Sequence, residues 1–536
     1  MSTLSDLLPA GSGGKQVNFV ASGALSNGQT VGLKSDGTVE TITTSTVAES
    51  MGSPVTTYFE TGINASTIIQ TKYSSCYDSL ANRLVVVFID KEPSSSTYFD
   101  LRYAIGTISG SSISFGTTGS VGNGQSPEFY TVSCVFHAGL GKAFLVFQQK
   151  IGASGIQMQT KLCTVNAATN TATFVGAFDF NANSQYWSTN NSLIGLVYDS
   201  VNETIVVCAK DVNTSNYTLA IANSNVGGNS WGTYQVINTS PIINNDSIAM
   251  CFDSTNNKIV IALFYSYQLH TIVVTAISAT PPGKASLSIG TTVTQPNLDG
   301  ANGFDLLYDS AKDRVVCFSQ DSNLIKYNNG VISGSGTSAV ITWATPGNVN
   351  AFSALWGTSG RAVYDSSTGE FAVIYLANSG SVPYYSIGRV DASNPNICTF
   401  NSPVSFNTSP AGSIESVTMA VNTTETGRIG CFYRDLSTNP STGYVFGGAS
   451  TVLTIGSSST TNINFIGITD EAIADTATGS VTIKGGIVTN ANLPTLTPNS
   501  VYYVQGNGTI STTSTSPAIR IGKALSSTSI NLEFNS

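Results

Sequence analysis

Charged side chains and histidine are scarce in this sequence. Only 10% of its 536 residues are charged, the net charge is −9, and the lysines and arginines do not cluster. Nucleic acid is therefore not an expected partner, because phosphate binding needs grouped basic side chains. The two histidines, His137 and His270, are far apart, and no Cys-x-x-Cys or His-Glu-x-x-His spacing occurs. We expect no catalytic centre, cofactor or metal, with His137 on a surface turn and His270 at a rim.

Long hydrophobic runs are also missing. Hydrophobic residues make up 41% of the chain, but they form short segments, and none approaches the roughly 20 residues that span a bilayer. The first residues, 1–6, have neither the basic segment nor the apolar core of a signal peptide. We therefore expect no membrane partner and no export by the general secretory route.

The eight cysteines show no disulfide pattern. Six of them fall at equivalent positions of repeated strands, where they alternate with Val, Ile and Phe: Cys76, Cys134, Cys208, Cys251, Cys317 and Cys431. We expect free, buried thiols, which fits synthesis in a reducing cytoplasm.

What the sequence does have is a repeated hairpin. In the clearest copy, apolar segments 248–252 and 259–265 flank the polar turn 253–258. Asp and Asn bond back to their own backbone in such turns, and the apolar flanks can be buried only as a sheet. With this one, the sequence contains seven copies at intervals of 54 to 62 residues, anchored on Asp78, His137, Asp199, Asp253, Asp309, Asp365 and Asn422.

Each repeat has room for a second hairpin, so the repeats predict seven four-stranded units. One hairpin cannot bury its apolar face alone, whereas stacked copies can. We therefore predict an all-β chain whose residues 50–450 form a seven-bladed β-propeller of four-stranded blades. The last repeat has strands near 416–421, 428–434 and 444–446 and lacks a fourth, which we expect residues 52–59 to supply.

The two ends of the chain predict a second, smaller domain. Residues 16–48 contain an Asp36-Gly37 hairpin signal, and residues 456–536 continue in the same style, with Asn507-Gly508-Thr509-Ile510 resembling a distant copy of Asp36-Gly37-Thr38-Val39. We interpret both segments as one split small β-barrel or sandwich domain interrupted by the propeller. Residues 1–15, with Gly11-Ser12-Gly13-Gly14, are expected to form a flexible or docking arm.

Segments 28–39, 465–472 and 502–532, the last containing Ile519-Arg520-Ile521-Gly522-Lys523, resemble the small β-domain of virion structural proteins from tailed bacteriophages, especially cyanophage-like marine phages. A similar domain occurs in capsid decoration proteins, and the Tyr-Asp-Ser repeats resemble propeller-like repeats of tail-fibre proteins. The resemblance implies a virion surface component that is made in the host cytoplasm and is present in multiple copies among tail, baseplate or capsid proteins. It names no active site.

Candidate site residues divide into two groups. The turn carboxylates of Asp78, Asp199, Asp253, Asp309 and Asp365 are interpreted as structural caps, because equivalent positions one blade apart cannot form the close pair that hydrolysis needs, although a calcium role stays open. Loop aromatics can stack on sugars, or they can pack between blades. The candidates for host-surface binding are Tyr98, Phe99, Tyr186, Trp187, Tyr267, Tyr384 and Tyr385.

Three functions follow. The first is a tail-fibre or baseplate-associated surface protein whose propeller contacts a host receptor or glycan. The second is a capsid decoration or head-fibre protein with a purely structural role. The third is a glycan hydrolase of sialidase type, but residues 224–231 resemble a sialidase Asp-box only once and with Val226 in place of its Asp, so we expect no enzyme.

Overall fold

A computed structural model provides the structure of the chain. It describes residues 15–34, 36–42, 44–46, 49–57, 73–91, 99–121, 129–151, 155–179, 194–211, 216–223, 235–237, 248–265, 268–277, 286–295, 303–321, 323–350, 354–355, 360–377, 382–406, 414–435, 447–455, 458–460, 465–505, 508–513 and 518–533. Within them the chain is all-β, and the short 3-10 helix Gly336–Ser338 is the sole helical element. In this part of the chain, no helix is long and apolar enough to cross a bilayer.

The chain divides into two compact units. The small unit contains Met1–Ala48 and Gly456–Ser536, and the large unit contains Glu49–Ile455. These boundaries lie within a few residues of the domain limits that the sequence predicted. We describe each unit separately.

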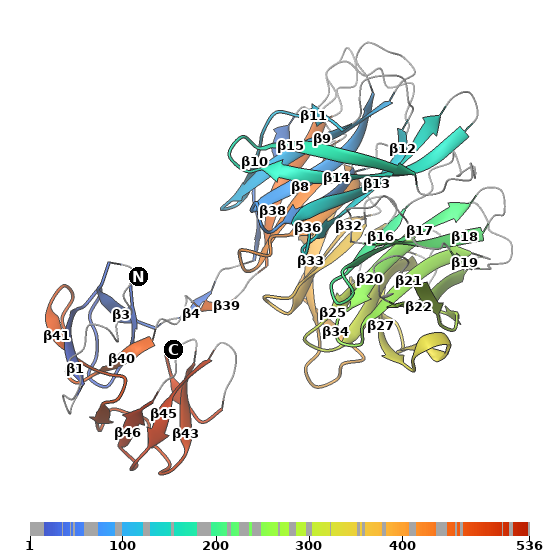
Figure 1. Cartoon of the computed structure of the whole chain (residues 1–536). Helices are drawn as coiled ribbons and strands as arrows, with labels where there is room; N and C mark the ends of the chain where they lie inside the picture. The colour runs from blue at the N-terminus through green and yellow to red at the C-terminus, as the bar shows by residue number, and fades with distance from the viewer. Residues whose placement is uncertain are drawn as a thin grey trace. The chain divides into compact units, whose positions relative to one another are not determined.

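The described residues of the large unit form seven antiparallel sheets, one for each repeat (Figure 1). Their first strands are β7 (Tyr73–Asp78), β12 (Phe129–His137), β16 (Gly195–Asp199), β20 (Ile248–Asp253), β25 (Phe304–Asp309), β31 (Arg361–Asp365) with β30 (Ala354–Leu355), and β36 (Ile414–Val421). The second strands are β8 (Arg83–Lys91), β13 (Lys142–Ile151), β17 (Thr204–Asp211), β21 (Lys258–Tyr265), β26 (Arg314–Asp321), β32 (Glu370–Ala377) and β37 (Arg428–Asp435).

The third and outer strands complete each sheet. The third strands are β9 (Phe99–Ser109), β14 (Gly155–Asn166), β18 (Asn216–Asn223), β22 (Gln268–Ile277), β27 (Leu324–Ser333), β33 (Pro383–Val390) and β38 (Gly447–Thr454). The outer strands of the first six sheets are β10 (Ser112–Phe115) with β11 (Gly119–Ser120), β15 (Thr171–Asp179), β19 (Gln235–Ile237), β23 (Ser286–Ile289) with β24 (Val293–Thr294), β28 (Val340–Trp343) with β29 (Gly347–Asn348), and β34 (Cys398–Phe400) with β35 (Val404–Ser405). Where two strands are named, both pair with the same third strand, so the outer strand is interrupted.

The outer strand of the seventh sheet comes from the start of the large unit. Strands β5 (Ser50–Met51) and β6 (Val55–Thr57) both pair with β38, antiparallel. This confirms the predicted fourth strand. The third strand of this sheet, β38, begins at Gly447, whereas the sequence placed it at 444–446.

The sheets pack face to face, which explains why their second strands are apolar on both sides. Ile259, Val260, Ile261, Ala262 and Leu263 of β21 are all fully buried. Alternate side chains belong to two different hydrophobic cores, one shared with the preceding sheet and one with the following sheet. A strand covered on both faces has a continuous apolar sequence, not an alternating one.

Seven such cores join the seven sheets in order, and one of them joins the last sheet to the first. It places Tyr73 and Phe88 with Phe432 and Val452. The first strands follow the same cyclic order of contact: β7, β12, β16, β20, β25, β31, β36 and again β7.

The small unit contains two five-stranded sheets. The first has the order β1 (Gln16–Val20), β41 (Thr478–Ile483), β40 (Phe465–Thr469), β2 (Thr30–Leu33), β3 (Val39–Thr41). The second has the order β42 (Ile487–Thr489), β46 (Ser529–Leu532), β45 (Ala518–Ala524), β43 (Val501–Gln505), β44 (Ile510–Ser511). The short strands β4 (Thr44–Thr46) and β39 (Ser458–Thr460) pair with each other. In Figure 1 the blue strands β1 and β3 accordingly share a sheet with the orange strands β40 and β41.

The two sheets of the small unit are copies of one five-stranded module. In chain order, β1, β2, β3, β40 and β41 correspond to β42, β43, β44, β45 and β46, and the spatial order of corresponding strands is identical. Residues 16–41 match residues 487–512 without a gap, and both copies have a bulge between the second and fourth strands. The 407-residue large unit therefore interrupts the first copy between its third and fourth strands.

Backbone hydrogen bonds repeat at equivalent positions of the two copies. The Gly28 amide donates to the Thr469 carbonyl at 3.0 Å, and the Asn499 amide donates to the Ala524 carbonyl at 2.8 Å. Gly28 and Asn499 both have positive φ, 80° and 71°. A left-handed residue in a turn is a constrained feature, so its recurrence at the matched position supports the duplication.

Candidate functional site: the repeated turns

Each repeated aspartate ends the first strand of its sheet and caps the turn that follows. Asp253 Oδ1 accepts the amides of Thr255 at 3.0 Å and Asn256 at 2.9 Å. Asp78, Asp199 and Asp309 bind two amides of their own turns in the same way, and Asp365 binds one. All five carboxylates are buried. Burial raises the pKa of Asp78 against the opposing effect of its two amide donors.

The turn also requires a left-handed residue. Four residues after the cap, φ is positive at Asn82, Glu203, Asn257 and Asp313, and Gly occupies this position in the turns after β12 and β31. Asn, Asp and Gly tolerate this conformation best. The turn sequence is thus explained by backbone geometry, with an acceptor at its start and a left-handed residue at its end.

The tyrosine that precedes the aspartate reaches the turn of the preceding sheet. The Tyr198 hydroxyl accepts the Gly139 amide at 3.4 Å, and the Tyr364 hydroxyl accepts the Ala311 amide at 3.3 Å. Burial raises the pKa of both tyrosines to about 12. In the Tyr-Asp pair, Asp therefore caps the turn of its own sheet, and Tyr accepts a hydrogen bond from the turn of the preceding sheet.

Further side chains connect successive turns. Asn202 Nδ2 donates to Asp199 Oδ2 at 2.7 Å and to Asn257 Oδ1 of the next turn at 3.1 Å. Asn256 Nδ2 likewise donates to Asp313 Oδ1 at 3.0 Å. The carboxylates and amides of these turns are thus engaged with one another.

His137 takes the place of the turn aspartate, and it is buried, so its prediction as a surface residue was wrong. Its Nδ1 accepts the Leu140 amide at 3.3 Å, and its ring lies 4.5 Å from the Tyr198 ring, centroid to centroid. Glu203 Oε2 lies 3.7 Å from the same nitrogen. Burial lowers the pKa of His137, although Glu203 opposes this shift. His270 is also buried, beside Thr294 near the start of β22.

Polar side chains join the first strands of neighbouring sheets at one recurring position. Ser74 Oγ accepts the Cys134 amide at 3.0 Å, and Asp305 Oδ2 accepts the Ala362 amide at 3.0 Å. Ser74 and Asp305 both lie four residues before their turn aspartates. The first strand of a sheet has unpaired amides at its edge, and these side chains satisfy them.

The Asp305 carboxylate and the Arg361 guanidinium are a charged pair on neighbouring first strands. Burial raises the pKa of Asp305, and Arg361 opposes that shift. Burial lowers the pKa of Arg361, and Asp305 opposes that shift in turn. Arg361 Nη1 donates to the Gly360 carbonyl at 2.7 Å. The pair supports packing between two sheets, and burial raises the pKa of the neighbouring Cys251 and Cys317 thiols, which keeps them protonated.

The aromatic candidates are not brought together by the structure. Tyr98, Tyr186, Trp187 and Tyr267 lie outside the described residues, as does the Asp-box-like segment 224–231. Phe99 begins β9, and nothing is described of its side chain. Tyr384 and Tyr385 are the second and third residues of β33 and so belong to a strand near its start.

Both of these tyrosines are used in packing. Tyr385 is buried, and its ring lies 6.2 Å from that of Phe406 in the core between the sixth and seventh sheets. Tyr384 is half-buried and stacks on Tyr375 of the neighbouring strand at 6.4 Å. Tyr385 is therefore withdrawn as a binding residue.

Among the described residues, no group of three or more His, Cys, Asp or Glu side chains is arranged to hold a metal ion. All eight cysteines are free and buried, as the sequence predicted. Burial raises the pKa of the Cys398 and Cys431 thiols to about 12, which keeps them protonated and unreactive.

No protein-family model and no curated protein matches the chain. Similar solved structures include the NanB sialidase of Streptococcus pneumoniae (12% identity, 75% of this chain and 70% of that chain, TM-score 0.39) and the WD40 domain of Toxoplasma gondii coronin (8%, 82% and 89%, 0.41). A periplasmic gluconolactonase of Pseudomonas aeruginosa is a third (10%, 73% and 97%, 0.41). At these identities and TM-scores the likenesses carry no argument about activity.

Proposed function

We propose that the large unit is a closed, seven-bladed β-propeller of four-stranded blades, inserted into a split small β-domain. The cyclic contact order of the first strands and the seven cores between sheets support this proposal. The pairing of β5 and β6 with β38 would hold the first and last blades together without a disulfide. The interrupted outer strands are consistent with blades that twist strongly at their rim.

We further propose that the protein is a bacteriophage virion structural protein, associated with the tail fibre or baseplate, whose propeller contacts a host-surface receptor or glycan. The observation that carries this proposal is the insertion itself. A 407-residue body leaves and re-enters the small unit between two strands of one module, so the small unit can be anchored while the propeller is displayed. The virion context comes from the sequence resemblance.

The chemistry of the described residues suits display better than catalysis. The turn carboxylates accept backbone amides of their own turns, and the histidine at the equivalent position also accepts a turn amide. Most glycoside hydrolases need two carboxylic groups facing one substrate bond, and the repeated turn aspartates lie on separate sheets. The alternative to a place at the tail fibre or baseplate is a place on the head, as a capsid decoration protein.

The test is to locate the full-length protein and measure its binding. Antibodies raised against it should label intact virions by immunogold electron microscopy, at the tail for the main proposal and at the head for decoration. Fluorescent full-length protein should bind host cells and lose binding when surface polysaccharide or protein is stripped. Unlabelled particles would refute the virion role, and release of reducing sugars from host envelope would refute the non-enzymatic account.

A further inference from the structure

The two copies in the small unit differ in what covers them. In the first copy, the outward face of the central strands is buried, including Thr30, Phe465 and Ile468. Second-copy residues cover it: Thr30 Oγ1 donates to the Gly508 carbonyl at 2.6 Å, and Phe465 and Ile468 belong to the same hydrophobic core as Tyr502. We call this the covered face.

The matching face of the second copy is not covered by the residues that the structure describes. Val501, Arg520 and Lys523 occupy the positions of Thr30, Phe465 and Ile468, and each is exposed or half-buried. Tyr503 lies beside them on the same strand and is also half-buried. We call these four residues the open face.

The contact between the copies is not self-complementary. The covering turn of the second copy contains Gly508, and the first-copy equivalent is the turn at Gly37, which is exposed. Each chain therefore has one open face and one unused turn of the type that covers such a face. Heterologous contacts of this kind propagate from copy to copy and close into a ring when the rotation allows.

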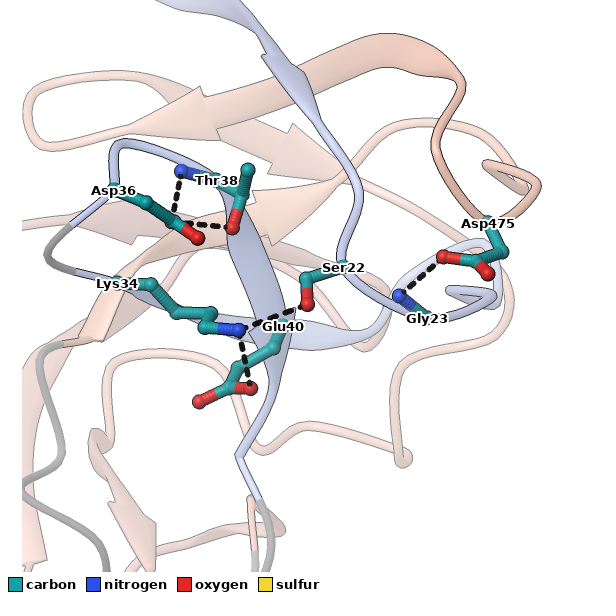
Figure 2. Close-up of polar contacts among 7 residues, drawn as sticks. All are labelled: Ser22, Gly23, Lys34, Asp36, Thr38, Glu40 and Asp475. Carbon is teal, nitrogen blue, oxygen red and sulfur yellow. Dashed lines mark hydrogen bonds and ion pairs between the residues drawn. The ribbon is translucent and has the colours of Figure 1, made fainter.

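The unused turn carries charge that complements the open face. Figure 2 shows Asp36 bound to Thr38, Glu40 beside Lys34, and Asp475 on the Gly23 amide. The first copy has five carboxylates and two lysines in residues 15–48 and 456–483, whereas residues 484–536 have three basic side chains and one carboxylate. Opposite charges across an interface favour association and fix its orientation.

We propose that the protein forms a homo-oligomer through its small unit, with the open face of one chain receiving the Gly37 turn of the next. Arg520 and Lys523 face Asp36 and Glu40 across this contact, and Val501 and Tyr503 supply its apolar part. The arrangement continues the packing that already exists between the two copies within one chain. It does not depend on the virion role.

The test is the mass of the full-length protein in solution, measured by light scattering on a sizing column at low salt. The wild type should have a mass of at least twice the 55.8 kDa of one chain. Arg520→Glu with Lys523→Glu should weaken assembly at least about tenfold, because two attractive pairs become repulsive. Asp36→Asn with Glu40→Lys should do the same; Asn is the residue of the second copy at this position and preserves the turn cap.

The four substitutions in one chain should restore assembly in part, because the Glu40→Lys side again meets the opposite charge, whereas asparagine at position 36 contributes no charge. Lys312→Glu, a charge reversal on an exposed turn of the large unit, should assemble like the wild type. A monomeric wild type overturns the proposal. An oligomer whose mass is unchanged by Arg520→Glu with Lys523→Glu also overturns it. So does a combined variant that stays as dissociated as the two double variants. Thermal unfolding of each variant separates lost assembly from lost folding.

Discussion

Ser75 and Thr418 are 343 positions apart in the chain, yet their hydroxyl oxygens lie 2.7 Å from each other. Ser75 is on β7 of the first sheet and Thr418 on β36 of the seventh. Thr418 occupies the position that Ser74 and Asp305 occupy in their own sheets, where each reaches the following sheet. The junction between the last and first sheets therefore joins equivalent positions to those joined between consecutive sheets, but through two hydroxyls in place of a side chain and a backbone amide.

Removing a turn cap should destabilise the large unit. Asp253→Ala should lower the free energy of unfolding by about 2 kcal/mol, because two buried amides lose their acceptor. Asp253→Asn should cost less, since Asn422 caps the seventh turn with an amide oxygen. Urea unfolding measures both, with the exposed Ser254→Ala as control. An Ala variant as stable as the wild type would contradict the capping role.

The duplication predicts that two matched glycines of the small unit are both sensitive to substitution. A Cβ at Gly467 would lie 2.2 Å from the Thr482 carbonyl oxygen, and one at Gly522 would lie 1.8 Å from that of Asn531. Gly467→Ala and Gly522→Ala should each cost about 2 kcal/mol, because backbone on the neighbouring strand must move. Thermal unfolding of the two variants beside the exposed Thr512→Ala tests this. Tolerance of either alanine would contradict the matched geometry.

His137 should make stability depend on pH below neutrality. Burial holds its folded pKa below the ordinary value of 6.5, so the unfolded chain binds more protons in the window between the lowered pKa and 6.5. The stabilising contribution of neutral His137 is complete above pH 6.5 and declines as pH falls through that window. His137→Asn keeps an acceptor for the Leu140 amide and should remove this component. The free energy of unfolding is measured from pH 5 to 8 for both proteins. If it depends on pH equally in the wild type and in the variant, the predicted role of His137 is contradicted.

The repeats were predictable because their signals are local. Asp253 and Asn257 specify a turn within one hairpin, and the spacing of such turns gives seven units. The bracing by Tyr198 and Tyr364 was not predicted, since their partners lie in another sheet, although recurrence of Tyr before Asp was a visible signal. The burial of Tyr385 was not predictable, because it depends on packing against residues of another sheet.

The sequence indicated the duplication at one turn only, because most side chains differ between the two copies whereas the turn residues are similar. Gly37 and Gly508 retain the left-handed turn, with φ of 83° and 78°, and this was the similarity that the sequence showed. Many other equivalent residues share burial but not identity, as Val31 and Tyr502 do. The open face could not be found at all without knowing which residues the second copy covers.

The closed ring is tested most directly by a cross-link between its first and last sheets. Cysteines replacing Ser75 and Thr418 should form an intrachain disulfide under mild oxidation, found by mass spectrometry of a non-reduced digest, because the two side chains already touch. Each single substitution should leave the chain without this bond. If the two cysteines remain separately alkylated in the folded double variant, the first and last sheets do not meet and the ring is not closed.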